Sequence, residues 1–236
     1  MFGRSKLHYA WIVAAVTFVT LLVGGATRAS PGLLIVPLEN EFQWSRATIS
    51  FAVAVNILLY GLIGPFAAAM METFGVRRIM LGALTLIGAG VALTPLMQQS
   101  WHLVVLWGFV VGSGTGVIAN VLAATIAARW FTARRGLVMG LLTSSAAAGQ
   151  LLFLPLLAAV IAAYGWRPMS LVLAAIVLIL LIPVAKYMRE HPQDVGLTSY
   201  GEAPGTSVPP ARTGNPVRVA FAALGTGVRS RDLWLL

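Results

Sequence analysis

Long apolar runs alternate with short polar interruptions along this chain. A helix needs about 20 apolar residues to cross the hydrocarbon core of a bilayer, and six runs reach that length. The predicted spans cover residues 7–37, 47–71, 76–97, 103–128, 136–164 and 169–187. The pattern therefore predicts an all-α, polytopic membrane protein.

The first run has two interpretations, because basic residues precede it as they precede the core of a signal peptide. Arg4 and Lys6 lie ahead of the run, which extends from Leu7 to Thr27 before its first charge. A signal peptide has an apolar region of only about 7 to 15 residues, and further spans follow here. We therefore interpret the run as a retained first helix.

A charged stretch between the second and third runs, residues 64–80 (GPFAAAMMETFGVRRIM), is predicted to be a hinge. Its only charges are Glu72, Arg77 and Arg78. Two spans must be joined by a polar turn at one membrane face, and a basic pair marks that face as cytoplasmic. Counting spans outward from this hinge assigns every other loop to a side.

Basic residues segregate between the two sets of loops. Of the 16 Lys and Arg residues, Arg46 and Arg167 fall on the side opposite the hinge, and Arg28 lies within the first span. The other thirteen fall on the hinge side: Arg4, Lys6, Arg77, Arg78, Arg129, Arg134, Arg135, Lys186, Arg189, Arg212, Arg218, Arg229 and Arg231. Basic loops stay in the cytoplasm, so we expect a multi-pass protein of the plasma membrane (the bacterial inner membrane) with a cytoplasmic N-terminus and linker.

Composition excludes several classes of function. The chain is 58% hydrophobic and 10% charged, whereas a soluble domain carries about 25% charge. The formal charge of +9 is spread over short clusters between spans, which argues against a nucleic-acid partner. The chain contains no cysteine, so disulfides, thiol catalysis and cysteine-ligated metal are excluded. The three histidines are far apart in sequence, and we expect no metal site.

Three segments are predicted. Residues 1–190 form a bundle of six membrane-spanning helices. Residues 191–231, rich in Pro, Gly, Ser and Thr at their centre, form a flexible cytoplasmic linker, within which residues 217–231 are able to form a short basic amphipathic helix. Residues 232–236 read as the start of a truncated seventh helix, so we expect the chain to be incomplete.

The hinge and the six-span layout resemble the major facilitator superfamily. That family has two six-helix halves joined by a cytoplasmic linker, with a motif G-x-x-x-D-R-x-G-R-R between helices two and three. The matching residues here are Gly64, Glu72, Gly75, Arg77 and Arg78, whereas Thr73 replaces the usual arginine and Ala68 a common glycine. The resemblance covers residues 8–236 and implies the N-terminal half of such a fold, whose partner is the missing C-terminal half.

The resemblance also implies a cytoplasmic gate. In the superfamily the charges of the hinge motif latch the two halves together on the cytoplasmic side. The basic loop after the fourth span is assigned to the same region through Arg129, Arg134 and Arg135. The alternative for all these charges is topology alone.

Within the superfamily the chain resembles bacterial monocarboxylate porters and oxalate/formate antiporter-like proteins. The similar stretches are RASPG at 28–32, PLENEFQWSR at 37–46, RWFTARRG at 129–136, and Gly149-Gln150 followed by Pro155. Drug–proton antiporters differ, because they carry an arginine where this chain has Gly108 and a G-P-x-x-G-G element that is missing from the fifth span.

Arg28 is the most informative side chain. It lies near mid-span, where an arginine costs several kcal/mol unless it faces water or a partner. One interpretation is a cation in a central cavity, and the alternative is an arginine that snorkels to the headgroups. The resemblance favours the first, since animal monocarboxylate transporters place a lysine in this stretch. Arginine offers a carboxylate a bidentate fork.

Four further polar residues are candidates for substrate binding: Asn56, Tyr60, Asn120 and Gln150. Asn56 and Tyr60 are four residues apart and share a helix face. Hydrogen bonding between helices is the alternative for each. The resemblance favours Asn120, because related carboxylate transporters use polar residues of the fourth helix. Gly108, Gly112 and Gly116 are predicted to form a close-packing face.

These features predict a secondary active transporter that works by alternating access. The substrate class is a small organic anion, a monocarboxylate or dicarboxylate, moved by proton symport or anion exchange. The alternatives are an exporter of another small solute and a transport-inactive membrane sensor or partner subunit. Nothing in the sequence resembles a hydrolase triad, a phosphate loop or paired catalytic carboxylates, so neither an enzyme nor a cofactor is expected.

Overall fold

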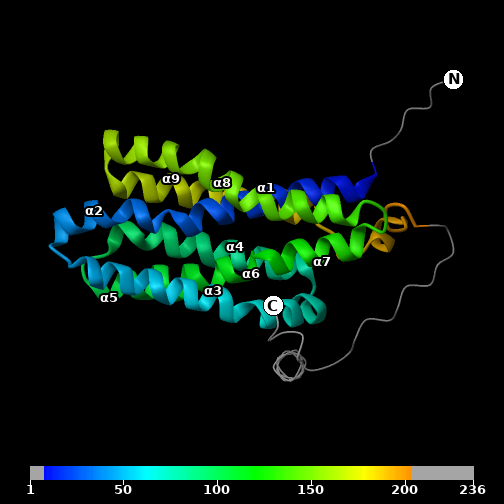
Figure 1. The fold of residues 1–236 in the computed structure, drawn as a ribbon, viewed down its shortest axis with the longest axis horizontal. Coiled ribbons are helices and arrows are strands. Elements are labelled where there is room, and N and C mark those ends of the chain that lie inside the picture. The colour runs from blue at the N-terminus through cyan, green and yellow to red at the C-terminus, as the bar shows by residue number, and fades with distance from the viewer. Residues whose placement is uncertain (1–7, 203–236) are drawn as a thin grey trace, which may run out of the picture.

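Six long helical spans lie lengthwise beside one another in the computed structural model, which describes residues 8–202 (Figure 1). The first three spans are α1 (Tyr9–Ala29) with α2 (Pro31–Phe42), α3 (Arg46–Phe74), and α4 (Val76–Leu93) with the 3-10 turn η1 (Thr94–Leu96). The fourth comprises α5 (Ser100–Leu103), the π-helical segment η2 (Val104–Val111), α6 (Gly112–Val117) and α7 (Asn120–Trp130). The last two are α8 (Arg135–Tyr164), and α9 (Trp166–Ile179) with α10 (Leu181–Tyr187), followed by the 3-10 turn η3 (Pro192–Val195).

The prediction of six helical spans is confirmed, and most boundaries agree within a turn. Ser45 is the N-cap of α3, where its hydroxyl accepts a hydrogen bond from the Thr48 amide at 3.2 Å. The first span was predicted to end at residue 37, which is wrong, because α2 continues through Glu39 and Glu41 to Phe42. The helix ends only at Gln43, whose left-handed conformation (φ 56°) reverses the chain.

The predicted hinge is shorter than the sequence suggested. α3 continues to Phe74, so Gly64 and Pro65 lie inside that helix. The turn to α4 is the single residue Gly75, which has φ 90°. A Cβ atom at this position would also collide with the Glu190 carboxylate. Both the backbone conformation and the available space therefore require glycine here.

The spans pack in three main pairs: α1 against α8, α3 against η2 and α6, and α4 against α9. Glycine allows the closest approaches. A Cβ atom on Gly25 would overlap the Ala146 backbone, and one on Gly149 would overlap the Leu22 carbonyl. The close-packing role predicted for the glycines of the fourth span is confirmed, since Gly112 faces the Asn56 backbone and Gly116 the Tyr60 backbone.

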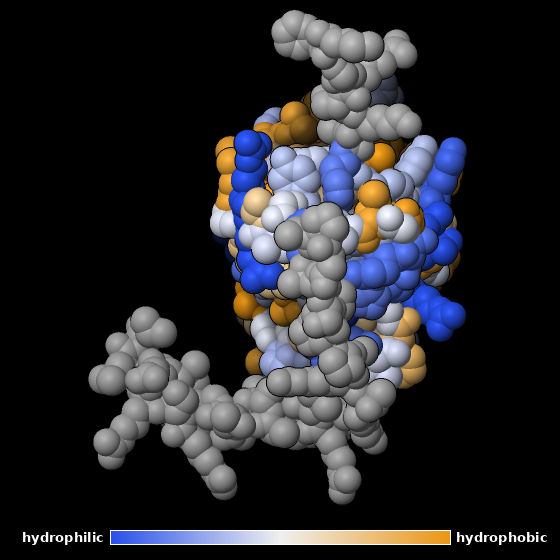
Figure 2. Space-filling model, turned by 90° about the vertical axis from the view of Figure 1, so that its right-hand side faces the viewer, coloured by the Kyte–Doolittle hydropathy of each residue, from blue (hydrophilic) through white to orange (hydrophobic). Residues whose placement is uncertain are grey.

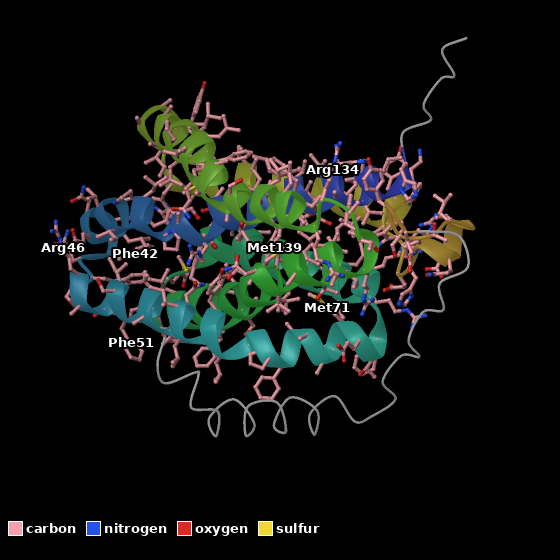
Figure 3. The ribbon with its side chains drawn as sticks, turned by 45° about the vertical axis from the view of Figure 1, so that its right-hand side comes forward. Phe42, Arg46, Phe51, Met71, Arg134 and Met139 are labelled. Carbon is pink, nitrogen blue, oxygen red and sulfur yellow. The ribbon has the colours of Figure 1, made fainter. Side chains whose placement is uncertain are left out.

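The sides of the bundle are apolar and its ends are polar. α3 and α8 expose large hydrophobic side chains such as Leu58 and Leu151, and Phe51 points away from the bundle in Figure 3. Figure 2 looks onto the end where α1 begins and α7 stops, and hydrophilic residues gather there. Arg134 lies at this end and Arg46 at the opposite one (Figure 3). This distribution suits a protein with lipid around its sides.

The predicted linker starts as a packed segment rather than a flexible one. The Tyr200 amide donates to the Trp130 carbonyl at 2.8 Å, and the Tyr200 carbonyl accepts from the amides of Thr132 and Ala133 at 3.0 Å. The Tyr200 ring also packs edge-on against Trp11. These contacts offset the entropy of ordering the segment. The rest of the linker, the predicted helix at 217–231 and the start of a seventh span at 232–236 lie outside the described residues.

Candidate functional site

Three of the five predicted substrate-binding residues line one small cavity near the middle of the bundle. Arg28 comes from α1, Tyr60 from α3 and Asn120 from the start of α7. The remaining lining consists mostly of small or apolar residues, including Gly24, Ile118, Leu142 and Ala146. The cavity holds about 10 Å³, the space of one water molecule. The bundle thus brings a cation, a phenol and an amide together around one small cavity, with Asn120 at its exposed side.

Arg28 lies over the face of the Tyr60 ring. Its Cζ atom is 4.7 Å from the ring centroid, which is a favourable cation–π geometry. The side chain is half-buried, and within residues 8–202 its guanidinium makes no hydrogen bond or ion pair. A ring beneath one face leaves the in-plane N–H groups available. Arg28 is therefore a mid-span cation whose charge has no anionic partner in the described part of the chain.

The fourth span is interrupted beside this cation. Ile118 (φ −87°, ψ 60°) and Ala119 (φ −119°, ψ −166°) leave the helical conformation, and α7 starts at Asn120. The first amides of a helix lack intrahelical partners and carry its positive dipole end. The fourth span predicted at 103–128 is present as Ser100–Trp130, but its helix is interrupted at this point, which the sequence analysis did not predict. The available signal was the glycine-rich stretch 112–116, since glycine weakens a helix.

Asn56 and Gln150 do not line this cavity. Asn56 is buried, and its Nδ2 donates to the Trp107 carbonyl at 2.6 Å. That carbonyl belongs to the π-helical segment η2, where the regular i→i−4 ladder is replaced by a looser one. The interhelical hydrogen bond, which was the alternative for Asn56, is thus present in the structure.

A second cluster of charges surrounds the turn at Gly75. The Glu190 carboxylate accepts hydrogen bonds from the Val76 amide at 2.5 Å and the Arg77 amide at 3.0 Å, so it caps α4. Arg77 donates through Nη2 to the Ala185 carbonyl at 2.5 Å. Sequence reasoning missed Glu190, although an acidic residue directly after a basic span end was a usable signal.

The basic loop after α7 joins the same cluster in part. Arg129 lies 3.8 Å from Glu190 and 3.4 Å from the Met71 carbonyl. Arg135 turns back onto α7 and donates to the Ala128 carbonyl at 2.9 Å, while Arg134 has φ 60° directly before α8. Around the turn lies an open cavity of about 630 Å³ that is lined by Glu72, Arg77, Arg78, Arg129 and Glu190, among others. The predicted gate residues Glu72, Gly75, Arg77, Arg78 and Arg129 therefore lie around one cavity together with Glu190, whereas Arg134 and Arg135 do not line it.

Comparison with known proteins finds a matching family and several related transporters. The family model described as Major Facilitator Superfamily matches residues 16–236. The transporter YcxA of Bacillus subtilis, described as an uncharacterized MFS-type transporter, is 25% identical over 80% of this chain and 46% of its own length. Monocarboxylate transporter 11 of Mus musculus is 26% identical over 97% of this chain and 47% of its own. Monocarboxylate transporter 14 of Homo sapiens is 29% identical over 71% of this chain and 33% of its own length.

The solved structures include a similar fold. The proton:xylose symporter XylE superposes with a TM-score of 0.66 at 19% identity, over 78% of this chain and 46% of that protein. This likeness concerns the fold alone. The chain spans about half the length of the curated relatives it matches, or less. The family match over most of the chain agrees with the six-span fold and the one-residue turn at Gly75, and the chain therefore belongs to the major facilitator superfamily.

Proposed function

We propose that this chain is half of a secondary transporter for a small organic anion, a monocarboxylate or dicarboxylate, with Arg28 as the counter-charge. The observation that carries the proposal is the state of Arg28: a mid-span guanidinium over Tyr60, without an anionic partner among residues 8–202. An unpaired cation at this depth is costly. A substrate carboxylate would compensate it and use the free in-plane N–H groups.

The interrupted fourth span supports an anionic substrate. Transporters commonly point the N-terminus of a broken helix at an anionic group of the substrate. α7 begins at Asn120, which lines the same cavity as Arg28. Its positive end adds to the field of the guanidinium, so the cavity favours negative charge. The printed names of the monocarboxylate transporters among the relatives agree with this substrate class.

The remaining parts of the mechanism follow from the fold family. Alternating access places the site between two six-helix halves, and this chain supplies one. Proton symport and anion exchange are the two coupling modes compatible with an anion site at Arg28. The charged cluster around Gly75 would form the cytoplasmic gate. The protein would lie in the plasma membrane with both ends of residues 8–202 on the cytoplasmic side. The excess of basic residues at this end supports that orientation.

The test is uptake by proteoliposomes that contain the complete gene product. A panel of labelled short monocarboxylates and dicarboxylates is compared with the corresponding uncharged amides. We expect saturable uptake of at least one carboxylate and none of its amide, because only the anion compensates Arg28. Equal uptake of acid and amide would contradict an anion site, and uptake of neither would favour a sensor or partner subunit.

A further inference from the structure

A buried series of hydrogen bonds joins α3, the fourth span and the end of the third span. The Asn56 Nδ2 donates to the Trp107 carbonyl at 2.6 Å, and the Trp107 indole donates to the Thr94 hydroxyl at 3.0 Å. The Thr94 hydroxyl in turn donates to the Gly90 carbonyl at 3.1 Å. Asn56, Trp107 and Thr94 are each no more than 2% exposed. A buried polar network whose groups are paired makes the packing of its helices more rigid and more specific.

The Asn56 bond acts on the π-helical segment η2. In a π-helix, a carbonyl accepts from the amide five residues later. For Trp107 that amide belongs to Gly112, which donates to the Phe109 carbonyl instead. Asn56 therefore supplies a donor to the Trp107 carbonyl close to the point where η2 gives way to α6. Because π-helical segments are rare, tertiary contacts of this kind are needed to hold one in place.

The winding of η2 sets how the rest of the fourth span faces α3, which lies beside it (Figure 1). A π-helix has more residues per turn than an α-helix, so the residues after η2 are rotated relative to their places in a continuous α-helix. This rotation presents glycines to α3. A Cβ atom on Gly112 would lie 2.9 Å from the Asn56 Cα. One on Gly116 would lie 3.1 Å from the Tyr60 Cα. Larger residues turned to this face would collide with the α3 backbone.

The contacts between α3 and the fourth span continue to the central cavity. Tyr60 lies one turn after Asn56 on α3 and lines the cavity. One turn further, a Cβ atom on Gly64 would lie 3.6 Å from Val121, which directly follows the cavity residue Asn120. Asn56 itself does not line the cavity. It lies at one end of a run of close contacts that leads to two residues that do.

We propose that Asn56 is a positioning residue for the anion site. Through its bond to the Trp107 carbonyl it fixes the winding of η2, and thereby the placement of Tyr60 and of the start of α7 around Arg28. The inference rests on the proposed function, because it assigns Asn56 to the same site without contact to the substrate. The placement of α7 against α3 is measurable without any substrate.

A cysteine pair reports this placement, since the chain contains no cysteine of its own. Gly64→Cys and Val121→Cys are introduced into the complete gene product, in which any cysteine outside this chain is replaced by serine. The rate of disulfide formation under mild oxidation is measured as the loss of free thiols after denaturation. A disulfide requires Cβ atoms about 3.5–4.5 Å apart. We expect Asn56→Leu, which has a similar size and no donor, to slow the reaction about tenfold or more.

Thr94→Val provides the matched control. It removes the neighbouring hydrogen bond of the Trp107 indole at nearly constant side-chain volume, and it leaves the Trp107 carbonyl bonded to Asn56. Both variants should lose thermal stability, since each removes a buried hydrogen bond. Only Asn56→Leu should also weaken carboxylate binding in calorimetry, by about two- to thirtyfold, as expected for a residue that acts without touching the ligand. Thr94→Val should stay within about twofold of the parent protein in cross-linking and in affinity.

A second variant disturbs the same bond from the opposite side and serves if Asn56→Leu does not fold. A Cβ atom on Gly112 would lie 3.2 Å from the Asn56 Nδ2, so Gly112→Ala should also slow cross-linking. Gly82→Ala, whose Cβ would meet no neighbouring atom within 4 Å, should not.

Cross-linking that stays fast in the folded variant, or that slows equally in Thr94→Val, would overturn the positioning role of Asn56. Slow cross-linking with unchanged carboxylate affinity would overturn its connection to the anion site. The predicted cross-linking in a protein that binds no carboxylate would contradict the proposed function and support the effect of Asn56 on the fourth span.

Discussion

The environment of Arg28 supports its proposed role as a cation in a central cavity rather than as a snorkelling arginine. A snorkelling arginine places its guanidinium among headgroups, whereas this one lies over Tyr60 and lines a cavity with Asn120. The ring provides one favourable contact but no negative charge. In the proposed site, a substrate anion would be the favourable partner that an intramembrane arginine requires.

Tyr60 offers a direct check on how Arg28 is positioned. Replacement Tyr60→Leu removes the aromatic face, and we expect carboxylate affinity to fall about 2- to 10-fold, since a partly desolvated cation–π contact contributes about 0.5–1.4 kcal/mol. Tyr60→Phe keeps the face and serves as the control, because the Tyr60 hydroxyl has no hydrogen bond to residues 8–202. Isothermal calorimetry on both variants measures the effect. Equal losses in the two variants would mean that the hydroxyl, not the ring, matters.

The site residues differed in how well they could be predicted from the sequence. Arg28 stood out because a charge inside an apolar run needs an explanation. Asn56 looked similar to Asn120 in sequence, yet it bonds to the Trp107 carbonyl because η2 is π-helical. The π-helical geometry of Val104–Val111 has no clear sequence signature, so this partner could not be predicted. Glu190 caps α4 only because the fold brings the end of the sixth span to the start of that helix.

The positions of the helical spans agree closely with the pattern of apolar residues, whereas the irregular elements do not follow from it. Ser45 and Gly75 lie at the two ends of α3, where serine and glycine are favoured for local reasons. Ends of this kind can be predicted from the sequence. The break at Ile118–Ala119 lies within one long apolar span, Ser100–Trp130, directly after the glycine-rich helix α6. Such breaks are tolerated only where the backbone is buried in protein or lines a cavity. The glycine-rich stretch 112–116 was a signal that this helix is weak, but tertiary context decided where it breaks.

The packed start of the linker, where Tyr200 contacts the loop after α7, leads to a testable prediction. Tyr200 holds the segment against the loop after α7 by backbone hydrogen bonds and by its ring. We expect Tyr200→Ala to increase amide hydrogen exchange at Thr132 and Ala133 about tenfold, because an aromatic pair contributes about 0.5–1.5 kcal/mol beyond its burial. Thr198→Ala, at an exposed position nearby, is the control. Exchange that stays slow in Tyr200→Ala would show that the backbone hydrogen bonds suffice.

The whole molecule combines a well-packed interior with two weakly covered spans. α1 and most of the fourth span are largely buried, whereas α3 and α8 expose much of their surface. The sequence predicted the number and order of spans from hydropathy. It did not reveal which spans pair, because apolar helices carry little information about their neighbours. Glycine contacts such as Gly149 against Leu22 fix these pairs, and they become visible only in the structure.

The orientation of the bundle is testable because the chain has no cysteine. Gln98→Cys lies in the exposed turn between the third and fourth spans, and Gln193→Cys lies in η3 near Gly75. We expect an impermeant thiol reagent outside intact cells to label the first and not the second, because basic loops stay inside. Labelling of Gln193→Cys alone would invert the orientation, and labelling of both would contradict the six-span arrangement.

Recognition of the substrate carboxylate by Arg28 is tested most directly by its affinity in the complete gene product. Calorimetry compares a transported carboxylate with its amide for the parent protein, Arg28→Lys and Arg28→Gln, at equal amounts of folded protein. We predict that Arg28→Gln weakens carboxylate binding roughly 100-fold or more, since it leaves an anion uncompensated in a low-dielectric site. Arg28→Lys should lose less, because it keeps the charge without the fork. Unchanged carboxylate affinity in Arg28→Gln would contradict the role of Arg28 as the counter-charge.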